Sequence, residues 1–101
     1  MVIKTKKEVA ELWLRDVRHD KMFWFHDGRM VKNLDELATT LREMAEETFH
    51  SHVAEDKNDF SHWVRDVIGD VTLANQLQKA TTQATSARRV EMRLNWVKAK
   101  L

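Results

Sequence analysis

Apolar residues recur with a helical period in the first segment of the chain, from Thr5 to about Arg18. They lie three or four positions apart and share one helix face: Val9, Leu12, Trp13 and Val17. Glu8 follows Thr5 by three positions, which is the spacing of a capping box. The pattern therefore predicts a helix that begins after Thr5.

Aromatic and other β-prone residues replace this period between Met22 and Val31, where they flank an Asp27-Gly28 pair. An Asp-Gly pair is typical of a type I′ turn, because both of its central positions need positive φ. The segment predicts two short strands joined at Asp27-Gly28. Since a lone hairpin is only marginally stable in water, we expect this one to lie on the helices.

The longest amphipathic pattern begins at Asn33, which forms a capping-box-like pair with Glu36. One stripe of this pattern is largely apolar: Leu34, Leu37, Ala38, Leu41, Met44, Ala45, Phe49 and His52. Carboxylates occupy mostly the opposite side: Asp35, Glu36, Glu43, Glu46 and Glu47. The pattern predicts a single helix with a strongly acidic outer face.

Two shorter helices are expected after a polar break at 54–58. Asn58 or Asp59 caps the first, and Gly69 ends it in the usual C′ role. Its apolar face is formed by Phe60, Trp63, Val64 and Val67. We expect this face to share one core with Leu41. Asp70 caps the second helix, whose apolar residues are Leu73, Ala74, Leu77 and Ala80.

The last helix is expected from about Ala84, after a weak polar joint, to the C-terminus. Its core-facing stripe consists of Ala87, Val90, Leu94, Val97 and Leu101. A second set is rotated away from this stripe: Arg89, Met92, Arg93, Trp96 and Lys100. Because Trp and Arg are enriched in interface hot spots, this set predicts a partner-binding surface. In the alternative interpretation, Trp96 packs under the hairpin or the first helix, and the cations pair with the acidic helix.

These elements predict one small domain over residues 1–101 that is mainly α, or α+β, with about five helices and one hairpin. Hydrophobic residues make up 43% of the chain, which is enough for one core. There is no Cys, so disulfides and thiolate metal sites are excluded. No apolar run is long enough to span a bilayer, and we see no signal peptide. We therefore expect a cytoplasmic protein without membrane contact.

Charge is segregated along the chain, although the net charge is only +1. Residues 1–32 hold eight basic and five acidic side chains, residues 33–70 three and ten, and residues 71–101 six and one. Such segments can pair with one another in the fold, or present a basic face to a partner. Pairing within the fold is the simpler interpretation.

A longer motif begins at His52 and ends at Ala74. It reads His52-Val53, Asn58-Asp59-Phe60, Trp63-Val64-Arg65-Asp66-Val67, Gly69-Asp70 and Leu73-Ala74. It resembles a small family of uncharacterised archaeal and bacterial domains, in which a hairpin with a Gly turn and a Leu-x-Glu-Leu helix precede the same run. With that upstream part, the resemblance covers roughly Phe23 to Leu77. It implies a fold unit with structural motif residues, and no activity or substrate.

The chemistry-bearing residues give no catalytic pattern. His50 and His52 lie two positions apart, so a helix points them to different sides, and His62 is ten positions further. His52 falls on the apolar stripe, which favours a hydrogen-bonded core histidine over a metal ligand. The acidic run at 55–59 lacks the Gly and the distal Glu of a calcium loop. No nucleophile elbow, phosphate loop or dinucleotide fingerprint is present, so we expect neither an enzyme, nor a cofactor, nor a metal.

Two classes of function remain open. The first is a protein-interaction or structural accessory module, acting as a homodimer or within a larger assembly through its C-terminal helix. The second is a nucleic-acid or ribosome binder that uses Lys4, Lys6, Lys7 and the basic face of the last helix. That role needs a basic cluster on one face, and the acidic middle segment argues against a uniformly basic surface. The first class is therefore favoured.

Overall fold

Helices make up most of this computed structural model, which describes residues 5–101. The α-helices are α1 (Lys6–Leu14), α2 (Leu34–Glu43), α3 (Glu46–His52), α4 (Asp59–Trp63), α5 (Val71–Lys79) and α6 (Gln83–Lys98). A short 3-10 helix, η1 (His19–Lys21), precedes the first hairpin, and a π-helical turn, η2 (Val64–Ile68), continues α4. Two antiparallel hairpins pair β1 (Phe23–Trp24) with β2 (Met30–Val31), and β3 (Val53–Ala54) with β4 (Lys57–Asn58). The predicted mainly α fold with a hairpin at Asp27-Gly28 is thus confirmed.

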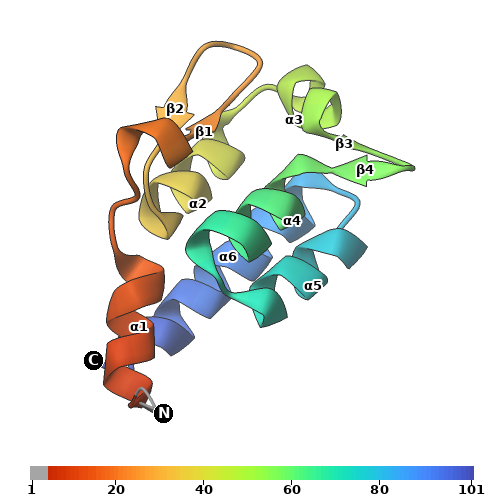
Figure 1. Ribbon diagram of the computed structural model, residues 1–101. Helices are drawn as coiled ribbons and strands as arrows, with labels where there is room; N and C mark the ends of the chain where they lie inside the picture. The colour runs from red at the N-terminus through yellow and green to blue at the C-terminus, as the bar shows by residue number, and fades with distance from the viewer. Residues whose placement is uncertain (1–4) are drawn as a thin grey trace.

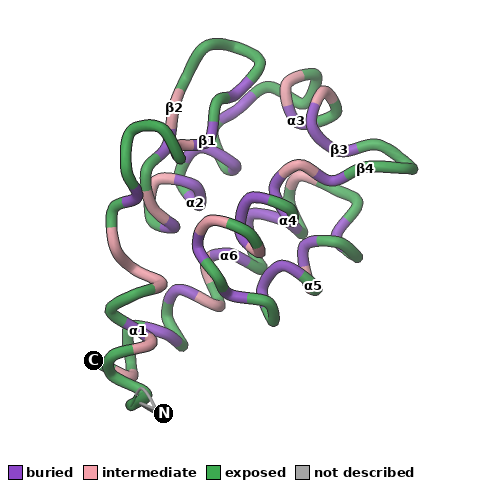
Figure 2. The backbone as a smooth tube through the Cα atoms, viewed as in Figure 1, coloured by how far each residue is buried: buried purple, intermediate pink, exposed green. Residues whose placement is uncertain are grey.

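Helix α6 is the central element of the packing. It contacts α1, α2 and α5, and its C-terminal half lies beside α1 at one end of the molecule (Figure 1). The first hairpin lies at another end, next to α2 (Figure 1). The faces that α2, α4, α5 and α6 turn toward one another are the buried ones (Figure 2).

Aromatic side chains fill the part of the core between the first hairpin and α4. Phe60 is fully buried, with its ring 5.2 Å from that of Phe23 and 5.8 Å from that of Phe49. Trp63 is also buried, and its indole N–H donates a hydrogen bond to the carbonyl of Lys21 (2.8 Å). As predicted, Phe60, Trp63 and Leu41 belong to one core.

The predicted helix caps are present where the sequence placed them. The Thr5 and Glu8 side chains form a capping box at the start of α1. Asn33, Asn58 and Asp70 each accept a backbone N–H three residues further on, at the starts of α2, α4 and α5. Of the two alternatives for α4, Asn58 is the cap. Gly69 ends the following turn with φ +95°, as its C′ role requires.

Helix α1 ends at Leu14, earlier than the expected Arg18, and Val17 is buried outside it. At this early end the backbone of Arg15 is extended, and its guanidinium donates to the Val67 carbonyl of η2 (2.8 Å). The Val17 N–H donates to the carbonyl of Lys32 (2.7 Å), so this segment runs along the hairpin.

The prediction of a type I′ turn in the first hairpin is wrong. Within residues 5–101 only Gly28 and Gly69 have positive φ, so Asp27 does not adopt the conformation that a type I′ turn requires. Gly28 N–H donates to the Phe25 carbonyl (2.9 Å), and Phe25 N–H donates to that of Arg29 (2.8 Å). This is a three-residue loop whose last position, Gly28, is left-handed.

The expected single helix from Asn33 is broken at Met44 and Ala45, which are extended. The side-chain amide of Gln83, at the start of α6, donates to the carbonyls of Leu41 (2.8 Å) and Met44 (2.7 Å). These bonds satisfy carbonyls that the end of α2 leaves free. After α3, where the sequence predicted a polar break, the structure has a second hairpin, in which Val53 pairs with Asn58.

Candidate functional site

The inner stripe of α6 is buried as predicted, with one exception. Ala87, Val90, Leu94 and Val97 belong to the buried residues of the chain. Leu101 is 57% exposed, because the helix ends at Lys98 and Leu101 lies beyond it. The stripe is therefore complete within the helix, and the outer face of α6 is free for another role.

Arg93, one of the five residues predicted to bind a partner, turns toward the protein. Its guanidinium donates two hydrogen bonds to the fully buried carboxylate of Asp70, at 2.7 and 3.0 Å. Only 12% of the Arg93 side chain is exposed. Asp70 also caps α5, so this ion pair joins α6 to the start of α5. Sequence reasoning assigned Asp70 to the cap and missed its partner.

The same guanidinium lies over two tryptophans. Its central carbon is 4.3 Å from the ring centroid of Trp96 and 5.2 Å from that of Trp13. The Lys100 ammonium lies 4.4 Å from the Trp96 ring. Such cation–π contacts stabilise each ring position. Trp96 nevertheless remains 49% exposed.

A small hollow opens between α1 and the C-terminal half of α6, which lie side by side in Figure 1. It has a volume of about 190 Å³ and is lined by Lys6, Val9, Ala10, Trp13, Trp96, Val97 and Lys100. We call it the Trp13–Trp96 groove. Its wall is apolar apart from Lys6 and Lys100, and no carboxylate lines it. The face of α1 that the sequence assigned to the core thus also forms one wall of this groove.

The remaining predicted contact residues lie outside the groove on α6. Met92 is 53% exposed and Arg89 is exposed. Positions 89, 92 and 96 follow one another at helical spacing on α6, and Lys100 lies in the turn just past its end. The structure therefore places four of the five predicted contact residues on the outer face of α6 or in the groove. Lys4, which the nucleic-acid alternative invoked, lies outside the described residues.

Ion pairs between α2 and α6 connect the oppositely charged segments of the chain. The Lys98 ammonium is 2.8 Å from a carboxylate oxygen of Asp35, and Arg42 pairs with Glu91. Together with Arg93 and Asp70, these contacts join the basic last segment to the acidic middle one. Pairing within the fold accounts for these residues. Within residues 5–101, neither Lys6 nor Lys100 takes part in an ion pair.

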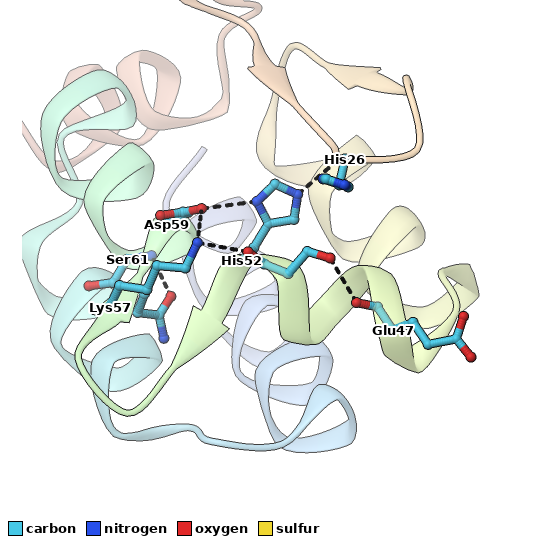
Figure 3. A network of polar contacts seen from close by, with 8 residues as sticks. His26, Glu47, His52, Lys57, Asp59 and Ser61 are labelled. Atoms are coloured by element: carbon cyan, nitrogen blue, oxygen red, sulfur yellow. Dashed lines mark hydrogen bonds and ion pairs between the residues drawn. The ribbon is translucent and has the colours of Figure 1, made fainter.

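A histidine–aspartate pair lies between the two hairpins (Figure 3). His52 is buried against Phe23, Phe25 and Phe60, and its Nδ1 lies 3.0 Å from a carboxylate oxygen of Asp59. The backbone N–H of His26 donates to its Nε2 (2.9 Å). Because Nε2 accepts this bond, the neutral ring carries its proton on Nδ1 and donates it to Asp59.

This pair has the composition of a catalytic dyad but not its geometry. A general base needs a free ring nitrogen within reach of the substrate proton, and here both ring nitrogens of His52 are occupied. Lys57 binds nearby, with its ammonium 3.6 Å from Asp59 and 2.7 Å from the carbonyl of Ser51 (Figure 3). The arrangement ties the first hairpin to β4 and α4. His52 is the hydrogen-bonded core histidine that the sequence predicted.

The other motif residues have structural contacts. The Asn58 side chain both caps α4 and donates to the Leu77 carbonyl (2.8 Å). Arg65 donates to the side chain of Asn75 (3.0 Å), while Asp66 is exposed. Ser61, which sequence reasoning passed over, is buried and donates to the Ala74 carbonyl (2.7 Å). The motif from His52 to Ala74 thus joins α3, α4 and α5.

Among residues 5–101, no three His, Cys, Asp or Glu side chains lie close enough together to hold a metal ion. None of the helices formed by these residues is both long enough and apolar enough to cross a membrane.

Comparisons with protein-family models, curated proteins and solved structures found no match to this chain. The resemblance of the His52 to Ala74 motif to a family therefore remains a prediction. The residues and geometry of the chain itself are the basis for a functional proposal.

Proposed function

We propose that this protein is a non-enzymatic protein-interaction module, and that it binds its partner through the Trp13–Trp96 groove and the outer face of α6. The observation that carries the proposal is the half-exposed Trp96, which lies next to an open apolar hollow. Tryptophan is highly buried on average, and it is enriched in interface hot spots. The core of α6 is complete without it.

The fixed geometry of the groove supports this role. Arg93 contacts both tryptophan rings and is itself held by two hydrogen bonds to Asp70. Trp96 is thereby ordered before a partner arrives. Binding then costs less conformational entropy than it would with a mobile side chain. A non-enzymatic role agrees with His52, whose ring nitrogens are both engaged inside the protein.

Nucleic-acid binding has less support from the same residues. Of the three cations predicted on the outer face of α6, Arg93 is largely buried against Asp70. This leaves Arg89 and Lys100, whereas phosphate recognition needs several cations on one face. Self-association is the other alternative, and both alternatives are outcomes of the test below.

Site-specific photo-crosslinking from Met92 tests the proposal. We expect one discrete protein adduct in host extract, which resists nuclease and is lost when Trp96→Ala is added. A crosslinker at Glu55, an exposed residue in the turn of the second hairpin, is the control and should not form this adduct. The captured protein, once purified, should bind wild type directly. No adduct, a nuclease-sensitive one, or one that Trp96→Ala leaves unchanged would contradict the proposal, whereas an adduct between two copies of this chain would establish self-association instead.

A further inference from the structure

The size of the Trp13–Trp96 groove limits what it can hold. Its volume is about 190 Å³. An apolar cavity of about 150 Å³ accommodates benzene, whereas pockets for drug-sized ligands measure about 300–1,000 Å³. The groove therefore has room for one aromatic ring or one aliphatic side chain. This size fits a single anchoring side chain of a partner protein.

The charge of the groove defines the surroundings of that side chain. Lys6 of α1 and Lys100, two residues past the end of α6, are its two charged lining residues, and both are cationic. On α1, the Glu8 carboxylate is engaged at the helix start with Thr5. Arg89 adds a cation on the same outer face of α6. An occupant with carboxylates beside its apolar anchor would complement these charges and would associate faster at low salt.

The outer face of α6 extends the groove along the helix. Trp96, Met92 and Arg89 follow one another toward the N-terminus of α6, and both apolar side chains are about half exposed. An apolar hollow between two helices, continued by an apolar ridge, suits an amphipathic helix. A second copy of this chain fits poorly. Its acidic helix α2 has its leucines fully buried, and Asp35 is already paired with Lys98.

We infer that the occupant is an acidic amphipathic segment of a partner protein, which inserts one apolar side chain between Trp13 and Trp96 and places carboxylates beside Lys6 and Lys100. The inference rests on the proposed function and adds the chemistry of the partner to it. It predicts that binding depends on both an apolar anchor and negative charge.

The test uses three synthetic helical peptides and the full chain. The first carries leucines on one face with glutamates beside them, the second replaces the glutamates by lysines, and the third replaces the leucines by glutamines. The four Trp indole N–H signals are followed by NMR, with Trp24 on the far hairpin and buried Trp63 as internal controls. The first peptide should shift the Trp13 and Trp96 signals in a saturable way. The second should bind at least roughly tenfold more weakly, and the third should not bind.

Charge reversal in the protein provides the matched variant. Lys6→Glu combined with Lys100→Glu should invert the preference, so that the lysine peptide binds more tightly than the glutamate peptide. The inference is overturned if the two charged peptides bind equally, if the shifts occur at Trp24, or if the variant keeps the wild-type preference. Crosslinking from Met92 separates the two proposals. A Trp96-dependent protein adduct together with no peptide preference would support the proposed function and refute only the inference that the partner segment is acidic.

Discussion

Arg93 of α6 holds Asp70 at the start of α5 through two hydrogen bonds of 2.7 and 3.0 Å, and the carboxylate is fully buried. This ion pair links the helix cap that the sequence predicted to the surface that it predicted for a partner. It is also the contact that places a cation against Trp96. The stability of the domain and the geometry of its groove are therefore coupled at one residue.

Removing Arg93 should strongly destabilise the protein. Arg93→Ala leaves the buried Asp70 carboxylate without its cation, and breaking such a pair costs about 3–5 kcal/mol. The double variant Arg93→Met with Asp70→Asn should lose less, because it leaves no uncompensated charge while an amide can still cap α5. Urea unfolding of both variants measures this difference. A single variant that is as stable as the double variant would show that the pair contributes little.

Trp63 should be the tryptophan that matters most for stability. Its side chain is buried against Phe23 and donates to the Lys21 carbonyl, so Trp63→Ala should cost about 3–5 kcal/mol. Trp24 is 60% exposed and serves as the control, for which Trp24→Ala should cost less than about 0.5 kcal/mol. Thermal unfolding of the two variants gives the comparison. A loss below about 1 kcal/mol for Trp63→Ala would mean that this side chain is peripheral.

Replacing His52 should loosen the first hairpin. His52→Phe keeps an aromatic ring among the phenylalanines but removes the acceptor for the His26 N–H, at a cost of about 1–3 kcal/mol. Hydrogen exchange at the His26 amide should become faster in this variant. In the wild type, ¹⁵N NMR should find the His52 proton on Nδ1. A proton on Nε2, or unchanged exchange at His26, would refute the described network.

Asp27 should titrate abnormally in the first hairpin. The backbone N–H of Arg29, and then its guanidinium, donate to the Asp27 carboxylate and lower its pKa below the usual 3.8. Its contribution to stability is therefore present above that value and is lost as pH falls through the lower folded pKa. Arg29→Ala removes only the side-chain bond, so the Asp27 pKa should rise part of the way. An NMR carboxyl titration checks this, and a wild-type midpoint at or above 3.8 would contradict it.

Features of this fold that depend on residues close together in the sequence could be predicted from it. Thr5, Asn33, Asn58 and Asp70 each accept a backbone N–H from the residue three positions on, and Gly69 needs only its own backbone conformation. Such local contacts leave a short sequence pattern. The positions of four α-helix starts followed from it.

The features that escaped prediction depend on distant residues. The break after α2 is stabilised by Gln83, far along the chain from the Leu41 and Met44 carbonyls that it binds. Met44 and Ala45 are ordinary helix formers, so nothing local marks the break. The groove was foreseen only in part: the alternative interpretation placed Trp96 under the hairpin or the first helix, but Trp13 appears in the sequence as a core residue. Its place beside Trp96 arises only when α1 packs on α6.

The central claim is that Trp96 serves binding and contributes little to folding. The most direct measurement is the affinity of the purified crosslinked partner for wild type and for Trp96→Ala, with the unfolding free energy of each. We expect the variant to bind at least roughly tenfold more weakly, a difference of about 1.4 kcal/mol, and to lose less than about 1 kcal/mol of stability. Unchanged affinity together with a loss of several kcal/mol in stability would show that Trp96 is a structural residue and that the groove is not the binding surface.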